Sequence, residues 1–242
     1  MAVLKDHIDY FEEIFGLDGF LQDPALVFGF QDCFLDYTIP ITQKITRHIK
    51  HWVTTLSRGT RGRPGKSIYH DHGIVPPKMQ CKNLQQMLNN YGLTKVTTLD
   101  YFDKRADIIF DMNNPLDPSY RESFATVIDI GSTEHVFDTR TCMSNLLMSC
   151  KVGGHFFMHT PCNGYFKHGF HTFNPEGIIQ TLEINGFQIR YVKYSTPDGI
   201  EVEYPDMVYS AIIWIVAKKT ASMNMFIAPQ QGEWAVRYKD RK

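Results

Sequence analysis

The sequence predicts an α/β fold with a mostly parallel sheet, an antiparallel last strand and helical additions. First, short apolar runs such as residues 126–131 end in polar residues, which is typical of buried parallel strands. Second, segments with helical spacing of apolar residues alternate with these runs. Third, the last two runs are separated only by a loop, which requires antiparallel pairing. The chain of 242 residues, 43% of them hydrophobic, is long enough to bury one large core.

The elements are expected in the following order. Residues 1–24 form a helical cover, because Leu4, Ile8, Phe11 and Phe15 recur at helical spacing before Gly16. Residues 25–219 form the main domain, with an insertion at about 33–78, and residues 220–242 form a polar tail. The insertion is expected to hold a helix over 41–56 and a mobile glycine- and arginine-rich loop over 57–66.

Within the main domain, residues 25–30 read as a buried first strand. A helix from Leu84 is stopped by Gly92. Strands are expected over 95–100 and 106–111, joined by a short or degenerate helix if both are parallel, and a further strand over 126–131. The remaining expected elements are a helix from Met143 that ends at Gly153-Gly154, a strand from His155, a helix that begins at Asn174-Pro175 and runs to Asn185-Gly186, and strands over 187–195 and 207–219.

Charge and cysteine content exclude several classes of partner. With 25 basic and 26 acidic residues the formal net charge is −1, so no overall field attracts nucleic acid or an anionic membrane. The five cysteines include no C-x-x-C pair, which indicates reduced thiols. Charged residues interrupt the first twenty positions, and no apolar run reaches the roughly 18 residues of a membrane span. We therefore expect a cytoplasmic protein without a nucleic-acid or membrane partner.

From about Ala25 to Lys219, the order of elements and the motifs at the strand ends resemble class I S-adenosylmethionine-dependent methyltransferases, with their Rossmann-like sheet. The resemblance implies that Asp100, at the end of the second strand, holds the ribose of S-adenosylmethionine. It also implies that Asp111 contacts the adenine amine with Met112 beside the ring, and that Asp129 and Gly131 face the methionine end.

The first motif departs from the family pattern. The glycine-rich loop is reduced to FGFQD, in which Gly29, Gln31 and Asp32 are the candidates for cofactor contact. An alternative first strand, SIYHDHG over 67–73, gives a more usual distance to Asp100. The run at 25–32 is preferred because 67–73 would place polar groups in a central strand.

The acceptor side follows from the same resemblance. Glu134-His135 matches a Glu-His pair common in the family, and residues 164–178 match a segment that often closes over the acceptor. The candidate catalytic residues are His168 and His171, because imidazole titrates near neutrality. The candidate substrate-binding residues are His159, Asn163, Tyr165 and Phe170.

Structural interpretations stand beside these roles. Asp100 and Asp111 are also placed to cap turns, and the histidines to pack within a loop. No metal is expected, because the histidine cluster lacks a spaced acid or cysteine. The segment GTRGRPGKS at 59–67 misses a phosphate-binding loop, since five residues rather than four separate its outer glycines.

The expected function is therefore S-adenosylmethionine-dependent methyl transfer to a small-molecule or glycan-like acceptor. The altered first motif supports an alternative, a catalytically inactive methyltransferase-like subunit for binding or assembly. A phosphate-loop nucleotide enzyme is a third possibility.

Overall fold

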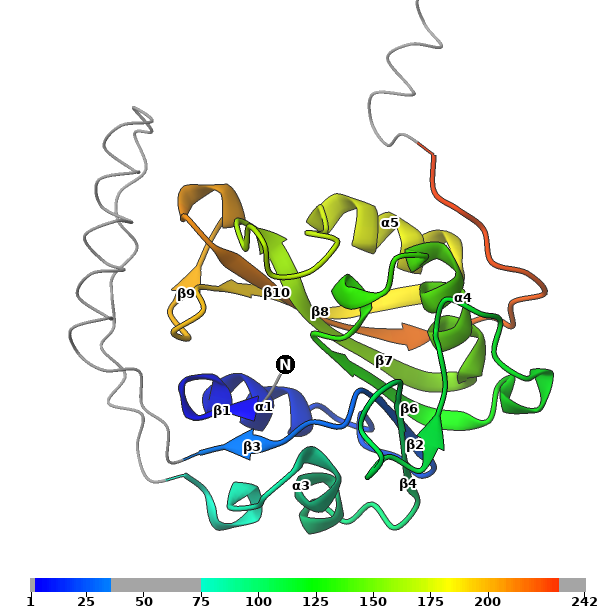
Figure 1. The fold of residues 1–242 in the computed structure, drawn as a ribbon, viewed down its shortest axis with the longest axis horizontal. Coiled ribbons are helices and arrows are strands. Elements are labelled where there is room, and N and C mark those ends of the chain that lie inside the picture. Colours follow the sequence, from blue (N-terminus) through cyan, green and yellow to red (C-terminus); the bar gives the residue numbers. More distant parts are fainter. Residues whose placement is uncertain (1–2, 36–74, 231–242) are drawn as a thin grey trace, which may run out of the picture.

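The computed structural model describes residues 3–35 and 75–230, and over these residues the chain forms one large sheet between two layers of helices (Figure 1). Among the described residues, the strands of this sheet lie in the order β5-β4-β2-β6-β7-β10-β8-β9. Their bounds are β5 (Ile108–Ile109), β4 (Val96–Asp100), β2 (Ala25–Phe28), β6 (Phe124–Ile130), β7 (Cys150–Asn163), β10 (Ala211–Lys219), β8 (Phe187–Ser195) and β9 (Glu201–Val202).

The direction of the strands confirms the predicted fold class. From β5 to β7 every neighbouring pair is parallel. The last long strand, β10, lies between β7 and β8 and is antiparallel to both. Residues 25–28 form the central strand β2, between β4 and β6, as the apolar run predicts.

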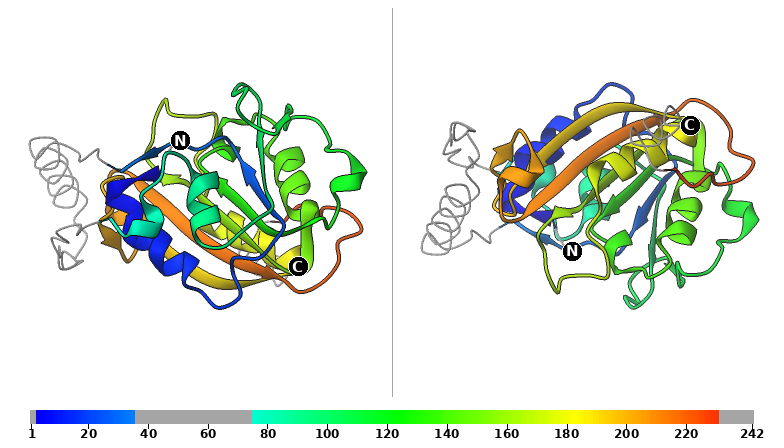
Figure 2. Two further views of the ribbon diagram at one scale, coloured as in Figure 1. Left: turned by 90° about the horizontal axis from the view of Figure 1, so that it is seen from below. Right: turned by 90° about the horizontal axis from the view of Figure 1, so that it is seen from above.

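Helices cover both faces of the sheet. Figure 2 shows the two layers from opposite sides, with the blue and cyan helices nearest the viewer in the left-hand picture. The described α-helices are α1 (Ile8–Phe15), α3 (Leu84–Asn90), α4 (Thr139–Ser149) and α5 (Pro175–Ile184). Short 3-10 turns are η1 (Lys5–His7), η2 (Pro77–Met79), η3 (Pro118–Tyr120), η4 (Thr133–His135) and η5 (Pro205–Met207).

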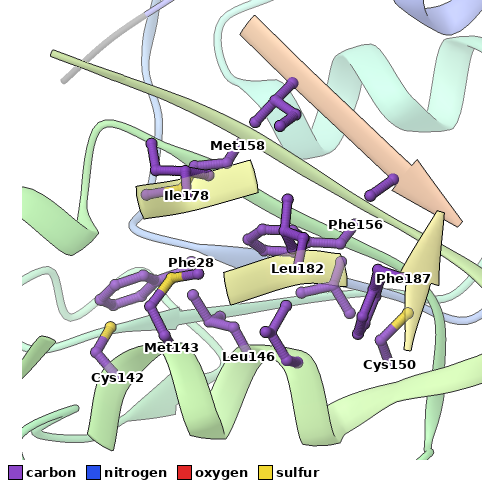
Figure 3. Close-up of a cluster of buried hydrophobic side chains, with 14 of the residues drawn as sticks. Phe28, Cys142, Met143, Leu146, Cys150, Phe156, Met158, Ile178, Leu182 and Phe187 are labelled. Carbon is purple, nitrogen blue, oxygen red and sulfur yellow. The ribbon is translucent and has the colours of Figure 1, made fainter. Parts of the chain in front are cut away.

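One core lies between the sheet and the helices α4 and α5. Met143 and Leu146 of α4 and Leu182 of α5 pack with Phe156 and Phe28 of the sheet (Figure 3). Because Phe156 and Met158 share this face of β7, the residues between them point to the other side of the sheet. The same alternation determines which histidines of β7 point toward each face of the sheet.

The second core lies between the sheet and the helices α1 and α3. Phe11 of α1 and Met87 of α3 pack with Phe157 and Trp214 of the sheet, all of them fully buried. Gly16 caps the end of α1, and Asn174 caps the start of α5, where its side chain accepts a hydrogen bond from the Glu176 amide at 2.9 Å. Both boundaries match the sequence signals.

Two expected details are wrong. Residues 101–107 join β4 to β5 through turns without a helix, because β5 pairs along only two residues and the Asp107 carboxylate accepts from Thr98 at 2.8 Å to close the connection. The helix α4 also ends earlier than predicted, at Ser149. Gly153 and Gly154 lie instead in the first part of β7, where a side chain on Gly154 would come within 2.6 Å of the Ala125 carbonyl oxygen.

Several expectations fall outside the described residues: the helix over 41–56, the loop over 57–66 and the alternative strand over 67–73. The described start of the insertion forms β3 (Cys33–Phe34), which pairs in parallel with β1 (Val3–Leu4). Residues 220–230 of the tail contact the main domain, since the Ile227 amide donates to Asn185 Oδ1 at 2.8 Å. Among the described helices, none combines the length and apolar character that a membrane crossing requires.

Candidate active site

The loops that leave the carboxyl ends of β4, β2, β6 and β7 meet at one edge of the sheet, where open α/β sheets bind their ligands. Hydrogen bonds join each exit to its neighbour. The Phe30 amide donates to Asp100 Oδ2 at 2.8 Å, and Gln31 Nε2 donates to Ser132 Oγ at 3.2 Å. Thr160 Oγ1 donates to Glu134 Oε2 at 3.0 Å. The predicted site residues of these four strands therefore belong to one connected edge.

Gly29 begins the exit of β2 and has a φ of 82°, a conformation that side chains rarely adopt. A Cβ here would lie 2.3 Å from Ser132 Oγ and 2.5 Å from Gln31 Nε2. The Ser132 hydroxyl also donates to the Phe28 carbonyl at 3.0 Å, so it is held close to the glycine. Gly29 thus allows the exits of β2 and β6 to approach each other.

Asp100 ends β4 and holds the surrounding loops by accepting backbone hydrogen bonds. Its Oδ1 accepts from the amides of Phe102 at 2.8 Å and Asp103 at 3.0 Å, while Oδ2 accepts from Phe30. A carboxylate offers about four acceptor positions, so one remains. The residue is half-buried, which leaves that position accessible from the edge of the sheet.

Asp32 is engaged by Arg105, from the turn between β4 and β5. The guanidinium donates to both carboxylate oxygens, at 3.0 and 2.9 Å, and its central carbon lies 4.3 Å from the centre of the Phe30 ring. Arg105 also pairs with Asp103, and these hydrogen bonds hold the pKa of the Asp103 carboxyl well below its usual value. The sequence pattern gave no role to Arg105.

Asp111 and Met112 follow β5. Asp111 Oδ1 accepts from the amide and the side chain of Asn113, at 2.9 and 2.7 Å, so it closes its own turn. Met112 is 2% exposed and packs in the core beneath α4, where its sulfur contacts Asn145 Nδ2 at 3.7 Å. Met112 therefore lies under the edge rather than on its surface.

Asp129, near the end of β6, is fully buried. Its Oδ1 accepts from the Ser132 amide at 3.0 Å, and its Oδ2 has no hydrogen-bond partner among the described residues. Burial raises the pKa of the Asp129 carboxyl to about 6. Gly131, two residues on, donates its amide to the His159 carbonyl at 2.7 Å and has a φ of 65°.

Glu134 lies in η4, just beyond β6, and its side chain is also completely buried. Thr160 occupies Oε2, whereas Oε1 has no hydrogen-bond partner among the described residues. Burial, together with the nearby charge of Asp129, raises the pKa of the Glu134 carboxyl to about 8. Two buried acids of raised pKa at a ligand-binding edge are characteristic of functional sites.

The exit of β7 carries both candidate catalytic histidines. His168 Nε2 lies 3.8 Å from Glu134 Oε1, and the imidazole ring of His168 is 5.0 Å from that of His135. His171 instead has its Nε2 at 3.1 Å from the Phe137 carbonyl oxygen. Of these two imidazoles, only that of His168 lies near the buried Glu134 carboxylate.

The predicted substrate-binding residues are not all together. His159 is fully buried against Trp214, with ring centres 4.2 Å apart, on the face of the sheet that α1 covers. Asn163 uses its amide to bridge the carbonyls of Pro205 and Val208, at 2.9 and 2.7 Å. Tyr165 contacts His168 with ring centres 5.3 Å apart, and Phe170 is exposed.

Exposed aromatic side chains surround this edge. They come from the loops that follow β4, β6 and β7, and a cluster of exposed apolar side chains often marks a ligand-binding surface. The members of this aromatic rim are Tyr101, Phe102, Phe137, Phe166 and Phe170, which are between 53% and 87% exposed.

Sequence reasoning gave no chemical role to Ser132, Glu134 or Thr160, although all three lie at the centre of the edge. One signal was available: Glu134 follows one parallel strand and His168 follows the next. Because the carboxyl ends of neighbouring parallel strands meet, residues in two successive exits are expected to be close.

No protein-family model matches the chain, and no curated protein sequence matches it. Solved structures of methyltransferases resemble it. An S-adenosylmethionine-dependent methyltransferase from Mesorhizobium loti shares 14% identity, with 55% of this chain and 84% of that chain covered and a TM-score of 0.40. Phosphoethanolamine N-methyltransferase 2 of Haemonchus contortus, solved with phosphomonomethylethanolamine and S-adenosylhomocysteine, shares 16%, with 57% and 46% covered and a TM-score of 0.41. Identities this low do not transfer an acceptor or a mechanism.

Proposed function

We propose that the protein binds S-adenosylmethionine at the carboxyl edge of β4, β2 and β6 and transfers its methyl group to a small-molecule or glycan-like acceptor. The proposal rests above all on two buried oxygen atoms that lack hydrogen-bond partners among the described residues, Gln31 Oε1 and Asp129 Oδ2. An unsatisfied buried acceptor is costly, and a ligand that donates to it removes this cost.

The chemistry of these two atoms fits the methionine end of the cofactor. That end carries an ammonium group, which can donate hydrogen bonds to both oxygens, together with a carboxylate and a positively charged sulfonium sulfur. The two residues are joined through Ser132, whose hydroxyl accepts from Gln31 and whose amide donates to Asp129. A buried carboxylate with one free oxygen attracts a cationic donor strongly, because charge-assisted hydrogen bonds are the stronger class.

Asp100 supports the nucleoside end of the same proposal. Three backbone amides fix its carboxylate in place, which leaves about one acceptor position for a ribose hydroxyl. Asp32 is a weaker candidate, because Arg105 already donates to both of its oxygens.

When bound, S-adenosylmethionine supplies a methyl group on a sulfonium sulfur. A lone pair of the acceptor attacks the methyl carbon while the carbon–sulfur bond breaks and its electrons return to sulfur. The protein then has to align the acceptor and exclude water. We expect the aromatic rim to supply apolar surface at the mouth of the site, and His168, which lies beside the buried Glu134 carboxylate, to help position the acceptor.

Calorimetric titrations with S-adenosylhomocysteine and with ATP, followed by S-adenosylmethionine, test this proposal. We expect binding of both S-adenosyl compounds and no binding of ATP. Binding of ATP alone would contradict the proposal and favour a nucleotide enzyme. Absence of all binding would instead favour a catalytically inactive, methyltransferase-like subunit.

A further inference from the structure

Glu134, His135 and His168 bring a carboxylate and two imidazoles together beside the proposed acceptor position. One ligand atom from each residue lies within 4.8 Å of the other two. His168 Nε2 lies 3.8 Å from Glu134 Oε1. This is too long for a hydrogen bond, so the two groups face each other without satisfying each other.

The buried carboxylate at the base of this cluster has one oxygen available. The Thr160 hydroxyl holds Glu134 Oε2, while the buried Oε1 has no hydrogen-bond partner in the described parts of the chain. A carboxylate that is completely buried and only half satisfied needs a cation or a donor at its other oxygen.

The loop that carries His168 is fixed to the same residue. The amides of Phe170 and His171 both donate to the Glu134 carbonyl, at 2.9 and 3.2 Å. A Cβ at Gly169 would lie 2.8 Å from that carbonyl oxygen, so glycine is needed for the close approach. Lys167, immediately before His168, has a φ of 67°, which is unfavourable for a residue with a side chain. The unfavourable backbone conformation of Lys167 is therefore part of the loop geometry that places the His168 side chain beside Glu134.

Two imidazoles and one carboxylate are a ligand set for divalent transition-metal ions, whereas Mg²⁺ prefers oxygen ligands alone. With metal–ligand bonds of about 2.1 Å, the ligand atoms would lie roughly 3 to 3.5 Å apart. Small movements of His135 and His168, both of which are exposed, would close the remaining gap. Three protein ligands leave coordination positions open, as in catalytic rather than structural zinc sites.

We propose that Glu134, His135 and His168 bind one divalent transition-metal ion, such as Zn²⁺, and that an oxygen of the methyl acceptor takes an open position on it. The second statement rests on the proposed function, whereas metal binding does not. A metal-bound hydroxyl would lose its proton to solvent near neutral pH, and the oxygen would then attack the methyl carbon. The new oxygen–carbon bond forms as the carbon–sulfur bond breaks, its electrons stay on sulfur, and S-adenosylhomocysteine leaves. The acceptor class is then a hydroxyl compound.

The test starts from full-length protein stripped of metal with a chelator. It is titrated with Zn²⁺ and with Mg²⁺ in a calorimeter, and Co²⁺ provides a visible absorption spectrum that reports nitrogen and oxygen coordination. We expect about one Zn²⁺ per chain, no comparable binding of Mg²⁺, and a Co²⁺ spectrum. The variants His135→Ala and His168→Ala, both at exposed positions, should weaken Zn²⁺ binding by roughly tenfold or more and abolish the spectrum.

The control is His171→Ala, which removes an imidazole of the same loop outside the cluster and should bind Zn²⁺ as the unchanged protein does. Equal Zn²⁺ affinity in the unchanged protein and in both cluster variants would overturn the inference. The same samples are titrated with S-adenosylhomocysteine. Binding of that ligand without any specific Zn²⁺ site would contradict only the metal inference, and a specific Zn²⁺ site without it would contradict only the proposed function.

Discussion

Arg105 and Asp32 form a two-point ion pair across the exits of β4 and β2, with nitrogen–oxygen distances of 3.0 and 2.9 Å. The pair is exposed, so solvent weakens its effect on stability. Its main consequence concerns ligand binding. Arg105 donates to both carboxylate oxygens of Asp32, which leaves that residue little capacity to accept a hydrogen bond from a ligand. Asp100, in contrast, retains about one acceptor position.

We therefore predict an order of effects on cofactor affinity. Asp100→Asn should weaken S-adenosylhomocysteine binding by about 2 kcal/mol, because a charge-assisted hydrogen bond to the ligand is lost. Asp32→Asn should weaken it less. Asp103→Asn, which removes a nearby negative charge that pairs with Arg105, is the control for general electrostatic effects. Isothermal titration of the three variants decides, and a larger loss for Asp32→Asn than for Asp100→Asn would refute the assignment of Asp100.

The contact between Gly29 and Ser132 gives a prediction for stability. Gly29→Ala should destabilise the protein more than Gly92→Ala does. Both positions have positive φ, 82° and 101°, but a Cβ at Gly92 meets nothing within 4 Å. The strain common to both is about 1 to 2 kcal/mol, and the clash with Ser132 should add about 1 kcal/mol or more to Gly29→Ala.

Chemical denaturation measures both effects. The double variant Gly29→Ala/Ser132→Ala should recover part of the added loss, because the hydroxyl that a Cβ would meet is gone. If Gly29→Ala and Gly92→Ala cost the same, the close approach of the two strand exits is not a constraint.

His159 gives a prediction for pH. Its ring is fully buried against Trp214, neither ring nitrogen has a hydrogen-bond partner among the described residues, and burial lowers the pKa of the imidazole well below its usual value. The unfolded chain therefore takes up a proton as the pH falls below about 6.5, while the folded protein does not. Stability that is fully present above this pH should be lost as the pH decreases.

The variant His159→Leu should reduce that loss by up to about 1.4 kcal/mol per pH unit between pH 6 and pH 5. Its stability at pH 8 should be equal to or above that of the unchanged protein, because an unsatisfied polar ring is replaced by an apolar side chain. Denaturation curves at pH 5, 6 and 8 measure both. An identical pH slope in the two proteins would show that His159 is not the titrating group.

The sequence predicted the central strands well, because strands buried on both faces are continuous apolar runs. Residues 25–28 and 124–130 are two such runs, and every residue in them is buried. The two-residue strand β5 is too short to carry a pattern, so the form of its connection to β4 could not be predicted. Asp100, at the end of β4, and Asp129, near the end of β6, were located correctly for the same reason.

The histidines were harder to place. His155, His159, His168 and His171 are close in sequence, but the alternation along β7 directs His155 and His159 to the side of the sheet that α1 covers. Only the loop after β7 returns a histidine, His168, to Glu134. This contact joins residues 34 positions apart and depends on a loop conformation that no periodicity encodes.

Hydrogen exchange with and without S-adenosylhomocysteine tests the central claim most directly. We predict slower exchange on ligand addition at the amides of Phe30, Phe102, Asp103 and Ser132, which surround Asp100 and Asp129. Peptides from β8 and β9, at the far edge of the sheet, should be unchanged. No ligand-dependent protection, or protection confined to residues away from the exits of β4, β2 and β6, would contradict a cofactor site at this edge.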